Sequence, residues 1–277
     1  MLVLVIGNHA QGVAWTAHHL KIPATIFMPI TTPKQKIIQV KFLGQDDVAI
    51  KLVGDTFDAS AEAARAYCKQ NNLTFIASFD DLDTMAGQGT IAKEIFMDAK
   101  EKQIDVDYLL CAIGGSGLIS GVSAYTKAVS SLTKVVGVEP DGAASMNAAF
   151  KAGRPVALPK MDKFVDGVAV KKVGELTYAN AKKNVDQLLK VPEGRVCTTI
   201  LELYNKEAIV AEPAGALSVS ALDKLKNEIE GKTVVCVVSV GNNDIGRMQE
   251  IKERSLIYEG KQCYFIVEFP QRPVQGH

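Results

Sequence analysis

Short apolar runs alternate with amphipathic stretches along almost the whole chain. The runs are nearly continuous rather than interrupted by polar residues, as in VDYLLCAI (106–113) and KTVVCVVSV (232–240). Such runs are typical of strands that are covered on both faces, which occur in parallel sheets joined by crossover helices. We therefore predict an α/β fold with parallel sheets between layers of helices. The expected strands span residues 2–6, 24–28, 48–53, 73–77, 108–113, 135–139 and 233–240. The expected helices span residues 9–20, 33–43, 57–71, 85–102, 118–130, 175–189, 213–229 and 245–254.

The chain divides best near residues 79–86, where acidic residues cluster in SFDDLDTMAG. We expect a small α/β domain at 1–83 and a larger one at 84–255. Residues 154–174 have few helix or strand signals and form a long connection that could line a site. The tail changes character again, because CYFIVEFP (263–270) alternates like an edge strand before two prolines stop it. Residues 256–277 are therefore expected to begin a further domain that is cut short.

Composition removes several classes of protein. The 277 residues contain 31 basic and 31 acidic side chains, and this zero net charge argues against a nucleic-acid binder. No apolar run is long enough for a membrane span, so we expect no membrane partner. The five cysteines are widely spaced without C-x-x-C, which favours a reducing cytoplasm and predicts neither a disulfide framework nor a metal site.

The strongest local signal is Gly114-Gly115-Ser116-Gly117, between an expected buried strand and an expected helix. Glycines at this place let backbone N–H groups converge at the positive end of the helix dipole, which forms a pocket for an anion such as phosphate. The alternative is a tight turn that binds nothing. The motif alone does not identify the molecule that carries the phosphate.

A dinucleotide site is one alternative. Gly115, Gly117 and Gly121 form a loose version of the dinucleotide fingerprint, and Glu139 ends the next strand, where a ribose-binding acid belongs. The glycine spacing differs from the usual one, however, and no acid/base partner for hydride transfer can be placed.

Three further polar residues lie at the expected ends of strands or starts of helices. Asn8 follows the first strand and either caps the next helix or binds a ligand. Ser239 lies at the carboxyl end of the last buried strand, where parallel sheets present ligands. Glu212 precedes Pro213, a natural first residue of a helix, and either caps that helix or faces a site.

Taken together, many segments in order resemble the threonine and serine dehydratases, pyridoxal-phosphate-dependent enzymes of fold type II, and most closely the biosynthetic threonine dehydratases. The resemblance covers the chain to about residue 254. It rests on GNHAQGVA, MPITTPKQKI, GDTFDASAEA, AGQGTIAKEI, AIGGSGLISGV, VVGVEPDGAASM, FVDGVAVKKVGE, EPAGALSV and SVGNNDIGR.

The resemblance implies a two-domain fold, pyridoxal phosphate as cofactor, and conversion of threonine, or alternatively serine, by a cytoplasmic homo-oligomer. For threonine the products are 2-oxobutanoate and ammonia. It implies that Asn8 binds the cofactor's 3′-oxygen, that Ser239 meets the pyridine nitrogen, and that Glu212, a candidate catalytic residue, lies near the ring or substrate. The residues implied to bind the phosphate are Gly114, Gly115, Ser116, Gly117 and Leu118.

The chain departs from the family pattern in four places. It has no Ser-Phe-Lys segment before Asn8, so the Schiff-base lysine of the family has no counterpart here. Val5, Ser116 and Val240 stand where the family has serine, glycine and glycine. The missing lysine segment, together with a tail (256–277) that resembles the opening of the family's C-terminal regulatory domain, predicts a chain truncated at both ends with an incomplete small domain. The alternatives to an active dehydratase are a non-catalytic remnant that binds the cofactor or phosphate, and a serine racemase-like enzyme.

Overall fold

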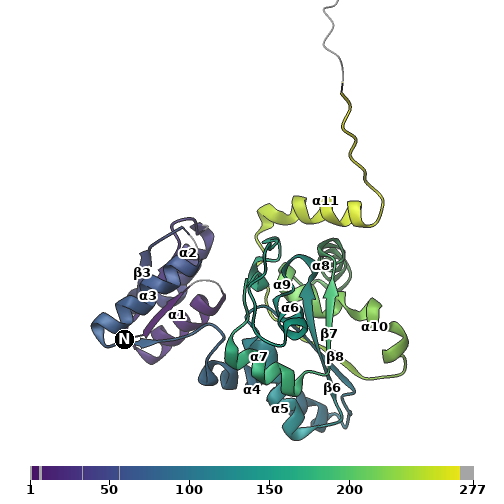
Figure 1. Ribbon diagram of the computed structural model, residues 1–277, viewed down its shortest axis with the longest axis horizontal. Coiled ribbons are helices and arrows are strands. Elements are labelled where there is room, and N and C mark those ends of the chain that lie inside the picture. Colours follow the sequence, from purple (N-terminus) through teal and green to yellow (C-terminus); the bar gives the residue numbers. More distant parts are fainter. Residues whose placement is uncertain (1, 6–7, 33, 56, 269–277) are drawn as a thin grey trace, which may run out of the picture.

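The protein, described by a computed structural model, contains two four-stranded parallel sheets, each covered by helices (Figure 1). The structure describes residues 2–5, 8–32, 34–55 and 57–268. Parts of three predicted segments, at residues 6, 33 and 269–270, lie outside these ranges. The two sheets confirm the predicted α/β class with parallel strands. The domain limits 1–83, 84–255 and 256–277 stay a prediction.

The first sheet has the strand order β3-β2-β1-β4. Its strands are β1 (Leu2–Val5), β2 (Ala24–Met28), β3 (Val48–Leu52) and β4 (Thr74–Phe75). Its helices are α1 (Asn8–Leu20), α2 (Lys34–Gly44), the short η1 (Gln45–Asp47) and α3 (Phe57–Asn71).

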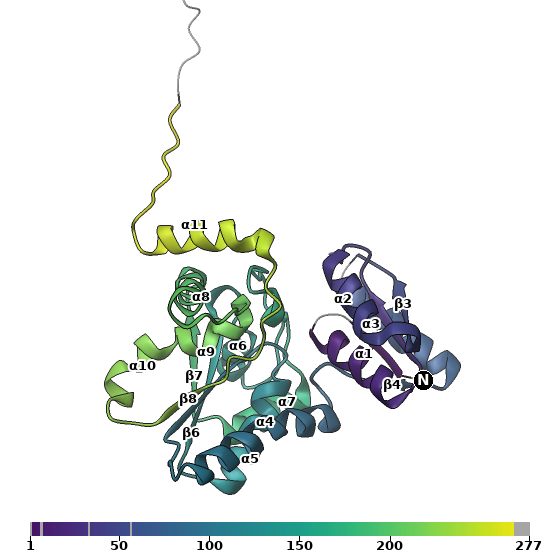
Figure 2. The ribbon, with the colours of Figure 1, turned by 180° about the vertical axis from the view of Figure 1, so that it is seen from behind.

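Alternation of side chains along β2 sets the two faces of this sheet. Ile26 and Met28 pack with residues of α1 and α2, whereas Phe27 packs with residues of α3. Because neighbouring residues of a strand point to opposite faces, one helix layer must lie on each side. The sheet is therefore the middle of three layers, and α1 lies on the side that faces the rest of the molecule in both views (Figures 1 and 2).

The second sheet has the strand order β7-β6-β5-β8. Its strands are β5 (Tyr108–Ala112), β6 (Lys134–Pro140), β7 (Gln187–Val191) and β8 (Val234–Cys236). Its α-helices are α4 (Leu82–Glu101), α5 (Gly117–Val129), α6 (Ser145–Ala152), α7 (Glu175–Asn184), α8 (Glu193–Glu207), α9 (Pro213–Ser220), α10 (Leu222–Ile229) and α11 (Met248–Tyr258). Short 3-10 helices are η2 (Asp141–Ala143), η3 (Asp166–Val168) and η4 (Ile245–Arg247).

Both faces of the second sheet are packed. Leu110 of β5 belongs to a buried cluster with residues of α8, α9 and α11, and its neighbour Leu109 belongs to one with residues of α4, α5 and α7. Both side chains are fully buried, as the continuous apolar run predicts. Helix α4 packs closely on α5 because Gly89 and Gly121 let the two backbones approach: a Cβ at Gly121 would lie 2.5 Å from the Gly89 nitrogen.

Asp80 ties the connection between the two sheets to α7. Its carboxylate accepts hydrogen bonds from the backbone N–H groups of Glu175 (3.2 Å), Leu176 (2.9 Å) and Thr177 (3.1 Å). A helix leaves its first N–H groups without intrahelical partners, and a carboxylate there is favoured by the helix dipole. Asp80 therefore caps α7 from 95 residues away in the sequence.

The structure corrects three predictions of secondary structure and adds two helices. The expected helix at 175–189 ends at Asn184, and β7 follows it at the edge of the sheet. Helices α6 and α8 were not predicted at all. The expected helix at 213–229 is divided at Ala221, and the expected strand at 233–240 ends at Cys236. For the first of these, a contact distant in sequence contributes: the Asp186 carboxylate accepts the Val135 N–H at 2.7 Å and aligns β7.

The expected edge strand in the tail is also absent from its described part. Residues 263–268 form no strand, and Figures 1 and 2 show the segment after α11 running away from both sheets. A strand needs a neighbour for its backbone hydrogen bonds, and none lies beside this segment. None of the helices in the described part of the chain is long and apolar enough to cross a membrane.

Candidate functional site

The first feature of the site is a hydrogen bond between the two sheet regions. Asn8, the first residue of α1, donates from Nδ2 to Oε1 of Glu212 at 3.1 Å. Glu212 directly precedes Pro213, which begins α9 as the sequence predicts. The structure thus brings together two of the predicted site residues, which are 204 positions apart in the sequence.

Asn242 extends this contact. Its Nδ2 donates to Oδ1 of Asn8 at 2.6 Å and to Oε1 of Gln11 at 3.2 Å. The segment that carries Asn242 is held against Glu212 through the backbone, because the Val240 carbonyl accepts the Glu212 N–H at 3.1 Å. Asn8 is therefore bound at both ends of its amide by residues that belong to the second sheet region.

Glu212 is almost fully buried, with 7% of its surface exposed. Burial raises the pKa of its carboxyl, repulsion from Asp166 adds to the rise, and the hydrogen bond from Asn8 opposes it. Gly167 leaves room for the carboxylate, since a Cβ there would lie 2.6 Å from Oε1. This environment favours the protonated form of Glu212.

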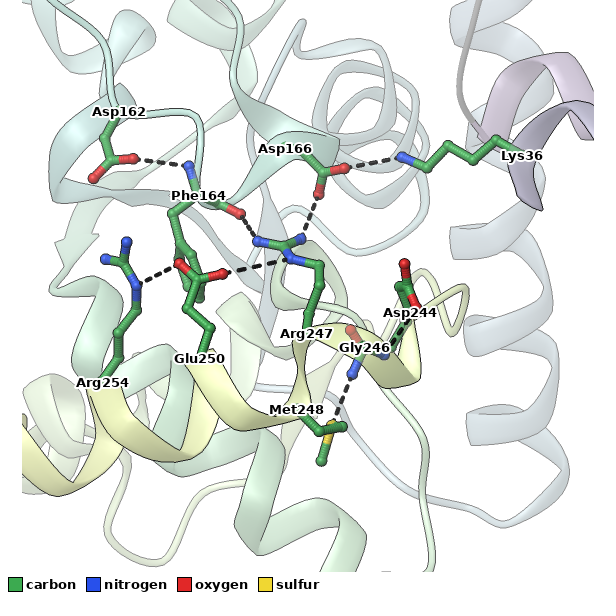
Figure 3. A network of polar contacts seen from close by, with 11 residues as sticks. Lys36, Asp162, Phe164, Asp166, Asp244, Gly246, Arg247, Met248, Glu250 and Arg254 are labelled. Carbon is green, nitrogen blue, oxygen red and sulfur yellow. Dashed lines mark hydrogen bonds and ion pairs between the residues drawn. The ribbon is translucent and has the colours of Figure 1, made fainter. Parts of the chain in front are cut away.

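Figure 3 shows a charged network around Asp166 and Arg247. Asp166, Lys36 and Arg247 of this network all act electrostatically on Glu212. Asp166 in η3 pairs with Lys36 of α2 at 2.9 Å and with Arg247 of η4 at 3.2 Å. Arg247 also donates to the Phe164 carbonyl at 2.7 Å, and its guanidinium lies 5.0 Å from the centre of the Phe164 ring. The pair of Lys36 and Asp166 is a further polar contact between the two sheet regions.

The predicted phosphate loop is glycine-rich for a reason that the sequence did not show. A Cβ at Gly115 would collide with the ring of Phe79, and one at Gly114 would lie 2.8 Å from the Val168 Cα. At Gly117 the nearest atom would be the Phe79 Cα at 3.0 Å. Side chains at Gly114 and Gly115 would therefore displace neighbouring protein atoms whether or not an anion binds there, and one at Gly117 would be in tight contact with Phe79.

Ser116 is the residue of this loop with a left-handed backbone, at φ 76°. It is buried and stands before α5, and its side chain makes no capping hydrogen bond to the helix. The first N–H groups of α5 have no intrahelical acceptors, so this buried and uncapped start of a helix suits an anion. Val168 of η3 contacts Gly114, and its neighbour Gly167 contacts Glu212, so η3 joins the loop to the buried carboxyl.

Ser239 and Glu139, which the sequence also singled out, form no hydrogen bond with Asn8 or Glu212 in the part of the chain that the structure describes. Ser239 lies beyond the end of β8 and is exposed, and its hydroxyl has no hydrogen-bond partner among the described residues. Its predicted role stays a prediction.

Glu139 is fully buried, and its carboxylate accepts the N–H groups of Met146 (2.7 Å) and Asn147 (2.9 Å) at the start of α6. Glu139 is therefore a helix cap, and the dinucleotide interpretation of this acid was wrong.

The three-layer fold, the uncapped helix start after a buried strand and the polar group between two sheets define a class of cofactor-dependent enzyme. Residues 4–240 match the family described as pyridoxal-phosphate dependent enzyme, and the chain belongs to this family. The predicted fold type II architecture is confirmed by solved structures of the same type.

The individual relatives make the resemblance more specific. The chain is 58% identical over 266 residues to the biosynthetic L-threonine dehydratase of Halalkalibacterium halodurans, covering 96% of this chain and 63% of that protein. It is 57% identical to that of Lactococcus lactis, covering 96% and 64%. Processed threonine deaminase isoform 2 of Solanum lycopersicum superposes with a TM-score of 0.85 at 34% identity, covering 92% of this chain and 69% of that one. Maize serine racemase gives 0.82 at 26%, covering 94% and 78%. The chain thus spans somewhat less than two thirds of the curated relatives' length.

The residues present fit pyridoxal phosphate. The cofactor carries a phosphate, a phenolic 3′-oxygen and a ring nitrogen, and the uncapped start of α5 and the Asn8 amide are matching donors for the first two. Sequence reasoning missed Gln11, Lys36, Asp166, Asn242 and Arg247. All five lie inside segments that carried the family resemblance, but their partners are up to 234 residues away.

Proposed function

We propose that the protein to which this chain belongs is a pyridoxal-phosphate-dependent threonine dehydratase, which converts threonine into 2-oxobutanoate and ammonia. The 57–58% identity to biosynthetic threonine dehydratases supports the substrate and the reaction. The observation that carries the proposal is the contact of Asn8 with Glu212 beside an uncapped, glycine-bordered helix start. A cytoplasmic location and a homo-oligomeric state belong to the same proposal and rest on the family resemblance.

The chain's own residues would act mainly by binding and orientation. Pyridoxal phosphate, when bound, supplies a ring that stabilises negative charge at the substrate's α-carbon. The N–H groups of residues 114–118 would hold its phosphate, and Asn8 would donate to its 3′-oxygen. Ser239 would meet the ring nitrogen with a neutral hydroxyl. Glu212 would face the ring or substrate with a carboxyl whose pKa is raised by burial and by Asp166.

The test combines binding with turnover. Calorimetry with pyridoxal phosphate measures affinity, the absorbance of a lysine Schiff base reports covalent attachment, and 2-oxobutanoate formation from threonine reports the reaction. Serine is assayed in parallel, because serine racemase is among the structural relatives. The proposal fails if the protein, extended to the full length of its relatives and well folded, neither binds the cofactor nor forms 2-oxobutanoate.

A second candidate applies to the 277-residue chain by itself, namely binding of the cofactor without turnover. The observation that favours it is that these 277 residues contain no Ser-Phe-Lys segment. Calorimetric binding without a Schiff-base absorbance and without product would support it. Covalent attachment to one of the chain's lysines, found by borohydride reduction and peptide mapping, would contradict it.

A further inference from the structure

The orientation of the Asn8 amide is set by the groups at its two ends. An ionised carboxylate is only an acceptor, so Glu212 requires the nitrogen of Asn8 on its side, at 3.1 Å. A protonated Glu212 could donate a hydrogen bond as well as accept one, so it would allow either the nitrogen or the oxygen of the Asn8 amide to face it. Burial raises the pKa of Glu212, so a contact that orients the Asn8 amide in either protonation state of this carboxyl must come from another residue.

Asn242 supplies the missing constraint. Its Nδ2 donates to Oδ1 of Asn8 at 2.6 Å, and its second proton goes to Oε1 of Gln11 at 3.2 Å. Gln11 lies one helical turn after Asn8 on α1, so the two acceptors lie on the same face of that helix. With both protons engaged, the Asn242 amide is itself oriented, and a flip would set its oxygen against two other oxygens.

We infer that Asn242 is a positioning residue of the cofactor site, which holds the Asn8 amide so that an N–H of Asn8 faces an acceptor oxygen of the ligand. The inference rests on the proposed function, in which that acceptor is the 3′-oxygen of pyridoxal phosphate. One proton of the Asn8 nitrogen goes to Glu212 and the other stays available. Because Asn242 follows β8 and Asn8 begins α1, this orientation exists only while the two sheet regions are together.

The test measures the affinity of the 277-residue chain for pyridoxal phosphate by calorimetry, with inorganic phosphate as a second probe. We expect Asn242→Ala to weaken cofactor binding about tenfold, the loss expected for one well-formed hydrogen bond. Phosphate affinity stays unchanged, since phosphate needs only the start of α5. Asn242→Asp keeps the shape of the side chain but removes both donors, so it weakens binding at least as much. Asn205→Ala, the same change at an exposed position of α8, leaves both affinities unchanged.

The pair of Asn8 and Asn242 is tested by a double-mutant cycle. If Asn242 acts through Asn8, then adding Asn242→Ala to Asn8→Ala weakens cofactor binding by less than about twofold more. Asn242 is exposed, so the variants are expected to fold, and thermal unfolding confirms this for each.

The inference is overturned if the losses of cofactor affinity in Asn8→Ala and Asn242→Ala add up in the double variant. It is also overturned if Asn242→Ala binds the cofactor as tightly as the unaltered chain does. Either result leaves the proposed function standing. A 277-residue chain that binds phosphate but no pyridoxal phosphate would overturn the inference and the second candidate function, cofactor binding by this chain alone, whereas the dehydratase proposal is decided by the full-length protein.

Discussion

The two sheet regions differ in how completely their helices cover them. The second sheet carries large buried clusters on both faces. The clusters of the first sheet are smaller, and its helices α1 and α2 leave Trp15, Ile38 and Phe42 exposed by 54%, 64% and 72%. The first region nevertheless supplies Asn8 and Lys36, which reach the second through polar contacts. The stable framework and the phosphate loop therefore belong to one region, and the residues that complete the site belong to the other.

The largest expected effect is a loss of stability from disturbing the packing of α4 on α5. Gly121→Ala places a Cβ against the backbone of α4, including the Gly89 nitrogen at 2.5 Å, and should lower the free energy of unfolding by about 3 kcal/mol. Urea unfolding followed by circular dichroism measures it.

Two glycines serve as controls for this change. Gly87 in α4 and Gly12 in α1 have no atom within 4 Å of an added Cβ, so Ala at either should raise stability by up to about 1 kcal/mol. A Gly121→Ala protein as stable as these controls would show that the close approach of α4 and α5 does not matter.

The next effect concerns the connection between the regions. Asp80→Ala removes the acceptor of three N–H groups at the start of α7 and should cost about 1–2 kcal/mol. Hydrogen exchange of the Leu176 and Thr177 amides should accelerate together with the loss of stability. Asp105→Ala, at an exposed position in the connection between α4 and β5, should change neither quantity, and unaltered exchange in Asp80→Ala would refute the capping role.

A smaller gain is expected at the phosphate loop. Ser116→Gly relieves a left-handed backbone at φ 76° and should stabilise the chain by about 1 kcal/mol. Ala208→Gly, which relieves φ 54° at the end of α8, should give a similar gain far from the site. Ser116→Ala keeps the unfavourable backbone and should give none. Thermal unfolding compares the three, and a loss of stability in Ser116→Gly would mean that the serine side chain is needed.

The smallest expected effect is a change in how the free energy of unfolding depends on pH. The pKa of Glu212 is raised in the folded chain, so folding favours its protonated form. Its contribution to stability is present below the ordinary value of 4.5 and is lost as pH rises through the folded pKa. Glu212→Gln should remove this decline from unfolding free energies measured between pH 4 and 8. The pKa of Glu139 is also raised by burial. Glu139 is present in both the unaltered chain and Glu212→Gln, so its contribution cancels when their free energies of unfolding are subtracted.

Much of the fold could be predicted from the sequence, because a strand covered on both faces must be apolar along its length. The expected strand at 24–28 coincides with β2, and β5 ends one residue before the expected 113. Strand β7 was missed because AKKNVDQLL continues the helical pattern of α7. Its pairing depends on Asp186, which binds the Val135 backbone 51 residues earlier. Such a contact leaves no local pattern.

The site was predictable in part for the same reason. The carboxyl ends of parallel strands present the residues that follow them, which places Asn8 and the loop at 114–117 correctly. That Asn8 meets Glu212 and Asn242 depends on how the two regions lie against each other, which no pattern within one region encodes. The pairing of Lys36 with Asp166 could not be predicted for the same reason.

The contact of Phe79 with the glycine loop bears on how such motifs are used to infer chemistry. Gly115 and Gly117 lack side chains because the aromatic residue after β4 occupies the space. A descendant of this chain that had lost its ligand would still be selected to keep Gly115, since a side chain there would collide with the Phe79 ring. In surveys of genomes, the glycine signature therefore reports ancestry and architecture, while loss of Asn8, Glu212 or Asn242 would be the better sign that cofactor use had been abandoned.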